Sequence, residues 1–183
     1  MVEAVERVRA RMHRAVQALD AAGVPFAVVG GNAVAAWVAQ VDEGAVRNTQ
    51  DVDILLRRED LVAAQQALAT VGIVYRKARN LDMFLDGPDS KARDALHVIF
   101  ARELVTPDSV MLAPDVDDSQ RLGAIPVVNL EALVGMKLTA FRLKDRVHLL
   151  DLLEVGLLDS SWPSRLPETL ASRLQSLIDN PDQ

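Results

Sequence analysis

Asp51 and Asp53 are the two residues of this sequence whose types and spacing point most directly to chemistry. They open the run Asp-Val-Asp-Ile-Leu-Leu, which alternates and then becomes apolar, a pattern that predicts a strand over residues 51–56. Residues two apart on a strand point to the same side, so both carboxylates could bind divalent cations. Solvated acids at a strand end are the alternative reading, because like charges on one face repel unless water, arginine or metal neutralises them.

A second Asp-Val-Asp triplet, Asp115 to Asp117, serves as an internal control. An acidic chain produces such triplets by chance. The second copy follows a proline in a polar stretch, residues 107–123, that we expect to be a loop. The first copy follows the polar run Arg47-Asn48-Thr49 and leads into apolar residues, so its context makes it the better candidate site.

Adjacent glycines, Gly30 and Gly31, lie between an apolar run at 26–29 and an alanine-rich segment at 32–41. The pattern predicts a buried strand, a glycine turn and a helix. Backbone N–H groups and the positive end of a helix dipole can hold phosphate at such a turn. A tight turn without any ligand is at least as common a reason for two glycines.

Lys137 is one of four lysines and lies inside an apolar stretch, where its ammonium group must reach water or meet an anion. On a continuous helix, Lys137, Lys144, His148 and Asp151 would share a narrow sector. Such a polar stripe contacts an anion or faces solvent, and a helix break at Asp145 would disrupt it.

In combination these segments resemble the nucleotidyltransferase superfamily. Residues 28–33, Val-Val-Gly-Gly-Asn-Ala, resemble its glycine turn, and residues 47–53, Arg-Asn-Thr-Gln-Asp-Val-Asp, resemble its carboxylate pair. Gly-Gly with Arg-x-Thr-x-Asp-x-Asp is typical of the abortive-infection and toxin–antitoxin branch, the AbiEii-like type. Residues 137–151 resemble the later helical motif of that branch, so the resemblance covers about residues 25 to 157.

The resemblance implies an α/β (α+β) fold in which helices flank a small mixed sheet. It also implies that a nucleoside monophosphate passes from a nucleoside triphosphate to a hydroxyl of RNA or protein, with two Mg²⁺ ions and with pyrophosphate leaving. Asp51 and Asp53 are then the metal-binding and catalytic acids. The toxin branch further implies an antitoxin-like partner protein. The predicted nucleotide-binding residues are Gly30, Gly31, Asn32, Arg47, Thr49, Lys137, Lys144 and Asp151.

One departure from the family concerns a third carboxylate, which many active members place on a later strand beside the pair. The matching strand, predicted over residues 96–100, carries His97 instead, with Asp94 and Glu103 on either side. His97 could ligate metal or act as a base and is included in the catalytic set, although strand histidines often only satisfy a polar neighbour. The alternative function is therefore a catalytically reduced nucleotide-binding or protein-interaction module that keeps the fold.

Composition narrows the class of protein. The 183 residues are 50% hydrophobic and 25% charged, which predicts a compact domain with a sizeable core. With no cysteine, the chain has no disulfide and no thiolate metal site. The net charge of −6 has the wrong sign for holding nucleic acid by bulk charge. No apolar run approaches the roughly 20 residues that span a bilayer, so we expect a cytoplasmic protein without a membrane partner.

The remaining pattern predicts the order of the elements. Helices are expected over 2–19, 59–70 and 129–155, with a possible restart at Asp145, and a last helix reaches residue 178. Further strands are expected at 73–75, 83–85 and 125–128, the last at a sheet edge because Pro126 cannot donate to a ladder. We expect residues 1–128 to form the nucleotidyltransferase-like core and residues 129–183 a helical part packed on it.

Overall fold

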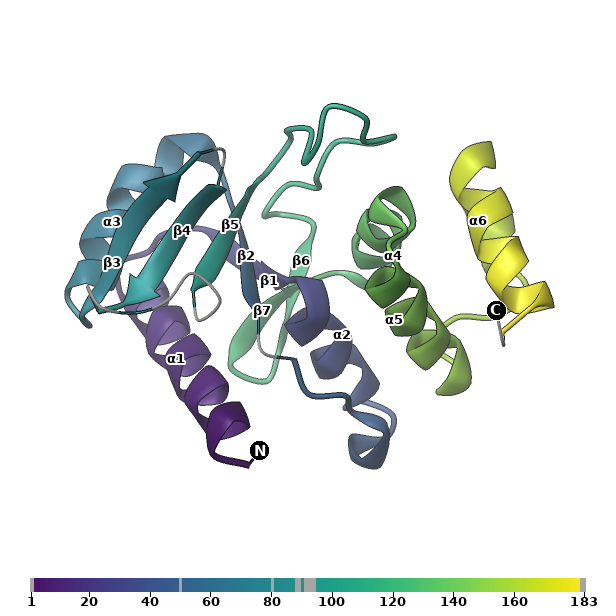
Figure 1. Cartoon of the computed structure of the whole chain (residues 1–183), viewed down its shortest axis with the longest axis horizontal. Helices are drawn as coiled ribbons and strands as arrows, with labels where there is room; N and C mark the ends of the chain where they lie inside the picture. Colours follow the sequence, from purple (N-terminus) through teal and green to yellow (C-terminus); the bar gives the residue numbers. More distant parts are fainter. Residues whose placement is uncertain (1, 50, 80, 88–89, 91–94, 182–183) are drawn as a thin grey trace.

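A mixed β-sheet forms the centre of the protein (Figure 1). The computed structural model describes residues 2–49, 51–79, 81–87, 90 and 95–181. Within them, seven strands form one sheet in the order β3-β4-β5-β2-β1-β7-β6. The strands are β1 Phe26–Val29, β2 Val52–Leu56, β3 Ile73–Ala78, β4 Leu81–Asp86, β5 Leu96–Phe100, β6 Ser119–Leu122 and β7 Ile125–Val128.

The central strands are nearly all apolar, which fits their burial on both faces. β2 runs antiparallel to β1 and parallel to β5. In this register Asp53 pairs with Val29 on one side and with His97 on the other. The end of β1, the start of β2 and the start of β5 therefore meet at one place in the sheet.

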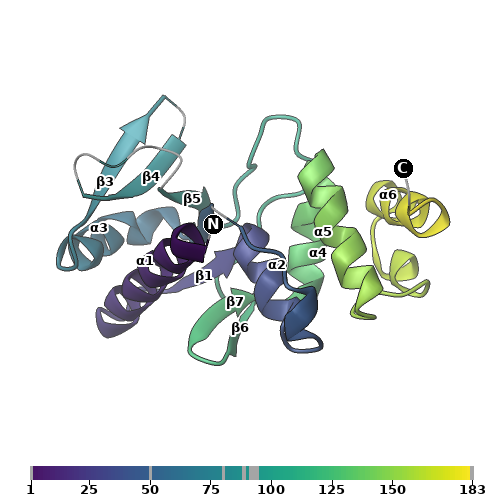
Figure 2. The same cartoon turned by 60° about the horizontal axis from the view of Figure 1, so that its bottom comes forward.

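Helices surround the sheet in two groups (Figures 1 and 2). α1 packs on α3, and α3 packs on β3, whereas α2 contacts β1, β2, α4 and α5, and α6 packs outermost on α4 and α5. No helix in the described part of the chain is long and apolar enough to cross a membrane. The helices are α1 Val2–Ala21, α2 Gly30–Val38, α3 Leu61–Ala69, α4 Leu130–Ala140, α5 Leu143–Glu154 and α6 Glu168–Asp179, with short 3-10 turns η1 Glu43–Ala45, η2 Arg58–Asp60 and η4 Trp162–Arg165.

A single large hydrophobic cluster joins the sheet to the C-terminal helices. Leu133 of α4, Leu149 of α5 and Leu174 of α6 are fully buried in the same cluster as Val28 and Ile54 of the central strands. Asn129 caps α4 as predicted, its side chain accepting a hydrogen bond from the Ala132 N–H at 2.9 Å. Helices 4 to 6 are thus held on the sheet by shared apolar packing.

The expected edge position of the 125–128 strand is wrong, because β7 lies between β1 and β6. The polar segment Ser119–Leu122, expected to be part of a loop, forms the edge strand β6. A two-residue turn at Gly123-Ala124 closes this hairpin, and Gly123 has the positive φ of 62° that such turns favour. Pro126 lies opposite Arg121, in the pair next to the one that closes the turn. Residues of such a pair do not exchange N–H···O bonds in an antiparallel ladder, so β6 needs no N–H from Pro126.

The helical region after Asn129 is broken before Asp145 rather than at it. Phe141 adopts a left-handed conformation with φ 48°, and α5 begins after Arg142, with Asp145 in its first turn. Arg173 of α6 holds this corner, because its guanidinium lies 5.2 Å from the Phe141 ring and donates to the last carbonyls of α4. The continuous helix assumed for the polar stripe is therefore not formed.

Candidate active site

The glycine turn and the acidic pair touch each other. Gly30 is the first residue of α2, directly after β1, and has a positive φ of 69°. A Cβ atom on Gly30 would lie 2.0 Å from Asp53 Oδ2. No side chain fits in that space, and L-residues rarely adopt that backbone conformation. The sequence therefore needs glycine here so that the Asp53 carboxylate can lie against the backbone at the start of α2.

The segment before β2 contacts the same glycine turn through a hydrogen bond and close packing. Asn32 Nδ2 donates to the backbone oxygen of Asp51 at 2.7 Å. A Cβ on Gly31 would lie 2.9 Å from Thr49 Oγ1, so this threonine sits directly over the second glycine. Asn32 and Thr49, both predicted from the sequence, thus shape the turn and hold Asp51 near it.

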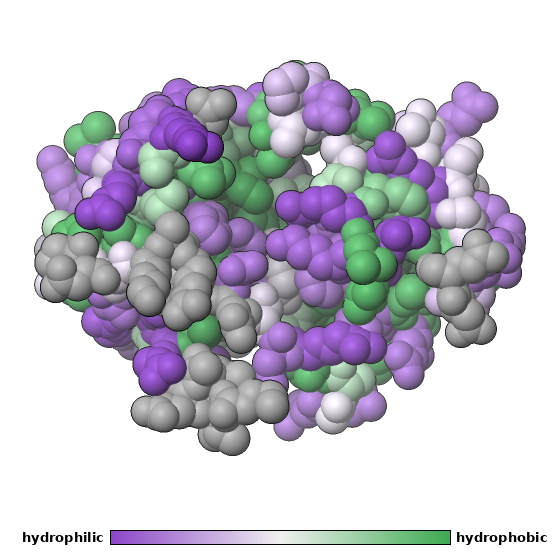
Figure 3. All heavy atoms as spheres, in the orientation of Figure 1, coloured by the Kyte–Doolittle hydropathy of each residue, from purple (hydrophilic) through white to green (hydrophobic). Residues whose placement is uncertain are grey.

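A cavity of about 580 Å³ opens at this point, a size typical of small-molecule sites. Around the centre of the face in Figure 3, hydrophilic and hydrophobic surfaces meet. The cavity has a floor from the turn and β2, a charged wall from α4 and α5, and an apolar wall from the loop after β5. Its lining includes Gly30, Gly31, Thr49, Asp51 and Asp53 of the floor, Lys137, Arg142, Lys144, Asp145 and His148 of the charged wall, and Val105, Met111 and Leu112 of the loop.

The charged wall is organised around Asp145. The Lys137 ammonium donates to Asp145 Oδ1 at 3.0 Å, and Arg142 Nε donates to Asp145 Oδ2 at 2.7 Å. Burial opposes the charge on Asp145, but its hydrogen bonds with Arg142 and the charge of Lys137 outweigh burial and lower the pKa of the carboxyl. Lys137 and Arg142 are two cations bound to the single anion Asp145. The wall therefore has an excess of positive charge beside Asp51 and Asp53.

Lys144 and Lys137 line the same cavity but differ in their exposure to solvent. Lys144 Nζ lies 3.8 Å from Asp51 Oδ2, and its side chain is about half exposed. Lys137 is buried, and that burial lowers the pKa of its ammonium group while Asp145 opposes the shift. Both lysines line one cavity although the helix between them is broken, which the sequence analysis expected to disrupt their shared face.

His97 occupies the strand position beside Asp53. Its Nδ1 lies 3.6 Å from Asp53 Oδ1, in agreement with their pairing across β2 and β5. Glu103 is engaged elsewhere, because both its oxygens accept hydrogen bonds from Arg58 at 2.6 Å. Asp94 lies outside the described residues.

Asp51 and Asp53 form a donor pair of the kind that can bind a divalent cation. Among the residues that the structure describes, no group of three or more histidine, cysteine, aspartate or glutamate side chains could hold a metal ion. Mg²⁺ is commonly bound by one or two protein carboxylates, with substrate phosphates and water supplying the other ligands. Asp51 and Asp53, both partly exposed at the cavity floor, provide such a pair.

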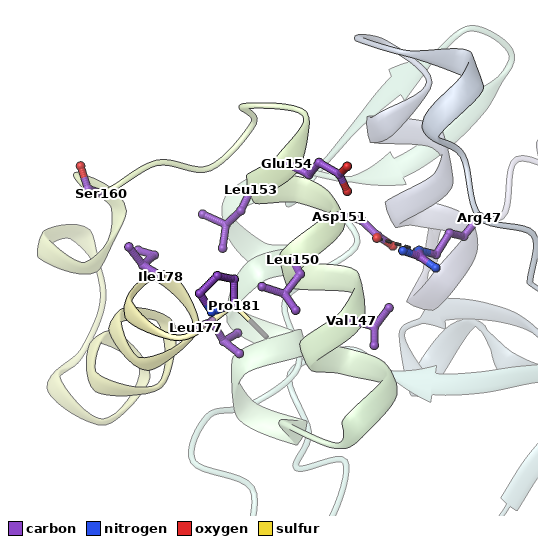
Figure 4. A pocket seen from close by; sticks show the side chains of 10 residues that line it. All are labelled: Arg47, Val147, Leu150, Asp151, Leu153, Glu154, Ser160, Leu177, Ile178 and Pro181. Carbon is purple, nitrogen blue, oxygen red and sulfur yellow. Dashed lines mark hydrogen bonds and ion pairs between the residues drawn. The ribbon is translucent and has the colours of Figure 1, made fainter. Parts of the chain in front are cut away.

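Arg47 and Asp151, both predicted to bind nucleotide, lie at a different cavity. Arg47 Nε donates to Asp151 Oδ1 at 2.7 Å, and the ion pair lies at the edge of a space of about 630 Å³ (Figure 4). The apolar side chains drawn there come mainly from α5 and α6, among them Leu150 and Leu177. The structure therefore brings six of the eight predicted nucleotide-binding residues to the turn and its cavity, and places this pair apart from them.

The control triplet is neutralised by arginine. Arg57 Nε donates to Asp115 Oδ1 at 2.8 Å, and Arg57 Nη2 lies 2.7 Å from Asp117 Oδ2. The hydrogen bond from Arg57 lowers the pKa of Asp115. The second Asp-Val-Asp copy thus has a local structural explanation, whereas Asp51 and Asp53 face a cavity.

Sequence reasoning missed two parts of the site. It treated Asp145 only as a helix cap, although a buried lysine needs an anion and Asp145 is the next acid along the chain from Lys137. It also missed the apolar loop wall. The available signal was the presence of large apolar residues, Met111 and Leu112, in a stretch expected to be loop, and both side chains are more than 40% exposed.

Comparison with known proteins identifies the fold. No family model and no curated protein matches the sequence. The solution structure of antibiotic-resistance factor ANT(2'')-Ia has a TM-score of 0.56 and 12% identity, covering 93% of this chain and 91% of that chain. JHP933 from Helicobacter pylori has a TM-score of 0.54 and 18% identity, covering 100% of this chain and 77% of that one. An H. pylori protein assigned as a nucleotidyltransferase has a TM-score of 0.54 and 16% identity, with coverages of 100% and 79%. The predicted fold class, a mixed sheet flanked by helices as in nucleotidyltransferases, is confirmed.

Proposed function

We propose that this protein is a magnesium-dependent nucleotidyltransferase that transfers a nucleoside monophosphate from a nucleoside triphosphate to a hydroxyl of RNA or protein. One observation supports it above the others: Gly30, Asp53 and Lys137, which are far apart in the sequence, line a single cavity. A glycine turn at a helix N-terminus, a carboxylate pair and a buried ammonium group together provide binding for a polyphosphate and its cation. The likeness to ANT(2'')-Ia and to the H. pylori proteins supports the fold on which the proposal rests.

The proposed reaction is a displacement at phosphorus. The acceptor oxygen forms a bond to the α-phosphorus, the bond from that phosphorus to its bridging oxygen breaks, and pyrophosphate leaves. The proton of the hydroxyl passes to a base beside the acceptor, for which Asp53 and His97 are the candidates. The backbone N–H groups at Gly30 and Gly31 would hold the phosphates, and Lys137 would offset their charge.

Asp51 and Asp53 would hold the magnesium ions with the phosphates. When bound, magnesium neutralises charge on the attacking and leaving oxygens. The protein contributes a fixed direction for the carboxylates, because Gly30 lies against Asp53 and Asn32 holds the backbone of Asp51. Lys144, 3.8 Å from Asp51, limits the repulsion between the acids while no cation is present.

Incubation with radiolabelled triphosphates and magnesium tests this function. The wild-type protein is expected to release pyrophosphate, and Asp53→Asn, which keeps the size of the side chain, is expected to lose at least about two orders of magnitude in rate. Asp117→Asn is the matched control from the second Asp-Val-Asp triplet and should leave the rate unchanged. Equal release by the wild type and Asp53→Asn would contradict the proposal.

A second candidate function follows from His97. With a histidine and not an acid beside Asp53, the protein could be a nucleotide-binding or interaction module with reduced turnover. That candidate predicts that calorimetry detects triphosphate binding while no pyrophosphate appears with any divalent metal. Pyrophosphate release that depends on Asp51 would eliminate it.

The role of a toxin with an antitoxin-like partner rests on the sequence resemblance to the AbiEii-like branch and stays a prediction. It predicts that induced expression slows the growth of a host cell and that Asp53→Asn expression does not. Equal growth of the two strains at equal protein level would argue against a toxin that acts by nucleotidyl transfer.

A further inference from the structure

His148 of α5 is a polar residue of the cavity for which the proposed function has no role. Its ring lines the same space as Asp53 and Lys137. Its Cε1 atom would lie 3.4 Å from a Cβ on Gly31, so the imidazole edge lies beside the second glycine of the turn. A phosphate bound by the backbone of that turn would therefore lie next to this ring.

The two ring nitrogens of His148 differ in surroundings. Nδ1 is buried and has no hydrogen-bond partner among the described residues. Since the ring lines the cavity and Nδ1 is enclosed, Nε2 is the nitrogen that can meet a ligand. Burying an N–H group without a partner costs more free energy than burying an unpaired acceptor nitrogen. Nδ1 is therefore favoured as the acceptor, and the neutral ring carries its proton on Nε2. That form presents a hydrogen-bond donor to the cavity.

The charges around the ring keep it neutral. Burial, together with the charges of Lys137 of α4 and Lys144 of α5, lowers the pKa of His148 to about 4, against the opposing effect of Asp145 and Asp151 of α5. Gly31 and Thr49, which approach from the turn and from the segment before β2, bring no charge. The ring is thus an uncharged donor at neutral pH, within an otherwise cationic wall.

We propose that His148 is a phosphate-binding residue of this pocket, donating from Nε2 to an oxygen of the polyphosphate beside Gly31. The inference rests on the proposed function, because it assumes that the polyphosphate lies at the glycine turn. Packing alone does not explain an imidazole here, since its Nδ1 is desolvated without compensation and an apolar ring would avoid that cost. A ligand contact at Nε2 explains why a polar ring occupies the position.

Imidazole NMR signals provide a direct test, because the chain contains three histidines, His13, His97 and His148. Inorganic tripolyphosphate without metal is the probe, so that the response reports the phosphates alone. We expect saturating tripolyphosphate to shift the His148 signals and to leave those of His13, exposed on α1, unchanged. His148 signals that stay fixed while calorimetry shows tripolyphosphate bound would overturn the inference and leave the proposed function standing.

Substitutions give an independent readout of affinity. His148→Ala is expected to weaken tripolyphosphate binding about tenfold, the loss of one hydrogen bond to a charged group. His148→Gln, whose amide N–H can replace Nε2–H, should recover most of that loss, and His13→Ala should bind like the wild type. Equal affinity of His148→Ala and the wild type would contradict the inference. Absence of both tripolyphosphate and magnesium–ATP binding by the wild type would instead refute the proposed function, and this inference with it.

Discussion

Gly30 and Asp53 depend on each other at the level of single atoms. The carboxylate fills the space that a side chain at Gly30 would need, with 2.0 Å between Asp53 Oδ2 and the built Cβ. Both the direction of the carboxylate and the backbone at the start of α2 follow from this contact. The smallest side chain at residue 30 must therefore move the proposed metal ligand.

Gly30→Ala is accordingly expected to abolish measurable nucleotidyl transfer. Gly23→Ala is a matched control, because Gly23 also has a positive φ, 65°, but a Cβ there would meet nothing within 4 Å. Both variants should lose roughly 1–2 kcal/mol of stability from the left-handed backbone. Pyrophosphate assays on folded protein should show loss in Gly30→Ala only; equal activity in the two variants would contradict the proposed role of this contact.

The pKa of His148 predicts a specific pH dependence of stability. The folded-state pKa of about 4 lies below the ordinary value of 6.5, so between these values the unfolded chain binds a proton that the folded chain does not. Stability should therefore fall as the pH drops from 6.5 towards 4, by on the order of 1 kcal/mol once solvent screening of this partly exposed ring is allowed for. Urea unfolding at pH 7 and pH 4.5 measures it, and His148→Gln should show a smaller drop. An identical drop in both proteins would contradict this account of the ring.

At the scale of elements, the corner between α4 and α5 carries the cationic wall. Lys137 belongs to α4, Asp145 belongs to α5, and their ion pair crosses the break at Phe141. Arg173 of α6 fixes that break by donating to the end of α4. The position of Lys137 in the cavity is thus a product of three helices.

Asp145→Ala should be the most destabilising single change at this corner. It would leave the buried ammonium group of Lys137 without its partner, at a cost of about 3–5 kcal/mol. Asp20→Ala is the control, because Asp20 forms an ion pair with the exposed Arg121 and should cost less than about 1 kcal/mol. Urea denaturation measures the free energy of unfolding of both variants. Similar losses would show that the buried ion pair stabilises the protein no more than the exposed one.

The same corner shows what the sequence could and could not predict. Apolar runs were sufficient for β1 and β2, because central strands buried on both faces leave a continuous hydrophobic signal, and the β-prone run of β5 was recognised although most of that strand is only partly buried. β6 left no such signal, since an edge strand of polar residues is defined by its partner and its turn. Asp145 gave a local signal for a restart near the break, and its side chain does cap the start of α5, whereas the contacts of Arg173 with Phe141 and the end of α4 come from more than 30 residues later in the chain and left no local pattern.

At the scale of the whole molecule, one hydrophobic cluster joins the sheet to the last helix. Trp37 of α2 donates its indole N–H to the backbone oxygen of Val128 in β7, and Trp162 of η4 lies beside α6. Each end of the cluster therefore has its own tryptophan fluorophore. The packing predicts one cooperative unfolding unit.

Leu174→Ala, in the fully buried face of α6, tests that cooperativity. We expect a loss of about 2–5 kcal/mol, reported equally by Trp37 in a Trp162→Phe background and by Trp162 in a Trp37→Phe background. Ser172→Ala, also on α6 but exposed, should change stability little. A Leu174→Ala effect seen by Trp162 alone would show that the C-terminal helices unfold separately.

The candidate site was predictable from the sequence in its residue types and only in part in its geometry. The glycine turn and the acidic pair lie at the ends of strands that the sequence defines well, but only the family resemblance predicted that they share a site, because their meeting depends on the register of β1 with β2. Arg47 and Asp151 fit the family motif equally well, yet they pair with each other at a second cavity, because their positions depend on how α5 packs. Asp145 and the apolar loop wall depend on tertiary contacts in the same way.

A crystal structure of the protein soaked with magnesium and a non-hydrolysable triphosphate would show whether the glycine turn, the acidic pair and Lys137 bind one ligand. We expect phosphates at the backbone of Gly30 and Gly31, magnesium on the carboxylates of Asp51 and Asp53, and Lys137 facing the polyphosphate. A triphosphate found at another surface, or within this cavity but away from the two aspartates, would contradict this expectation.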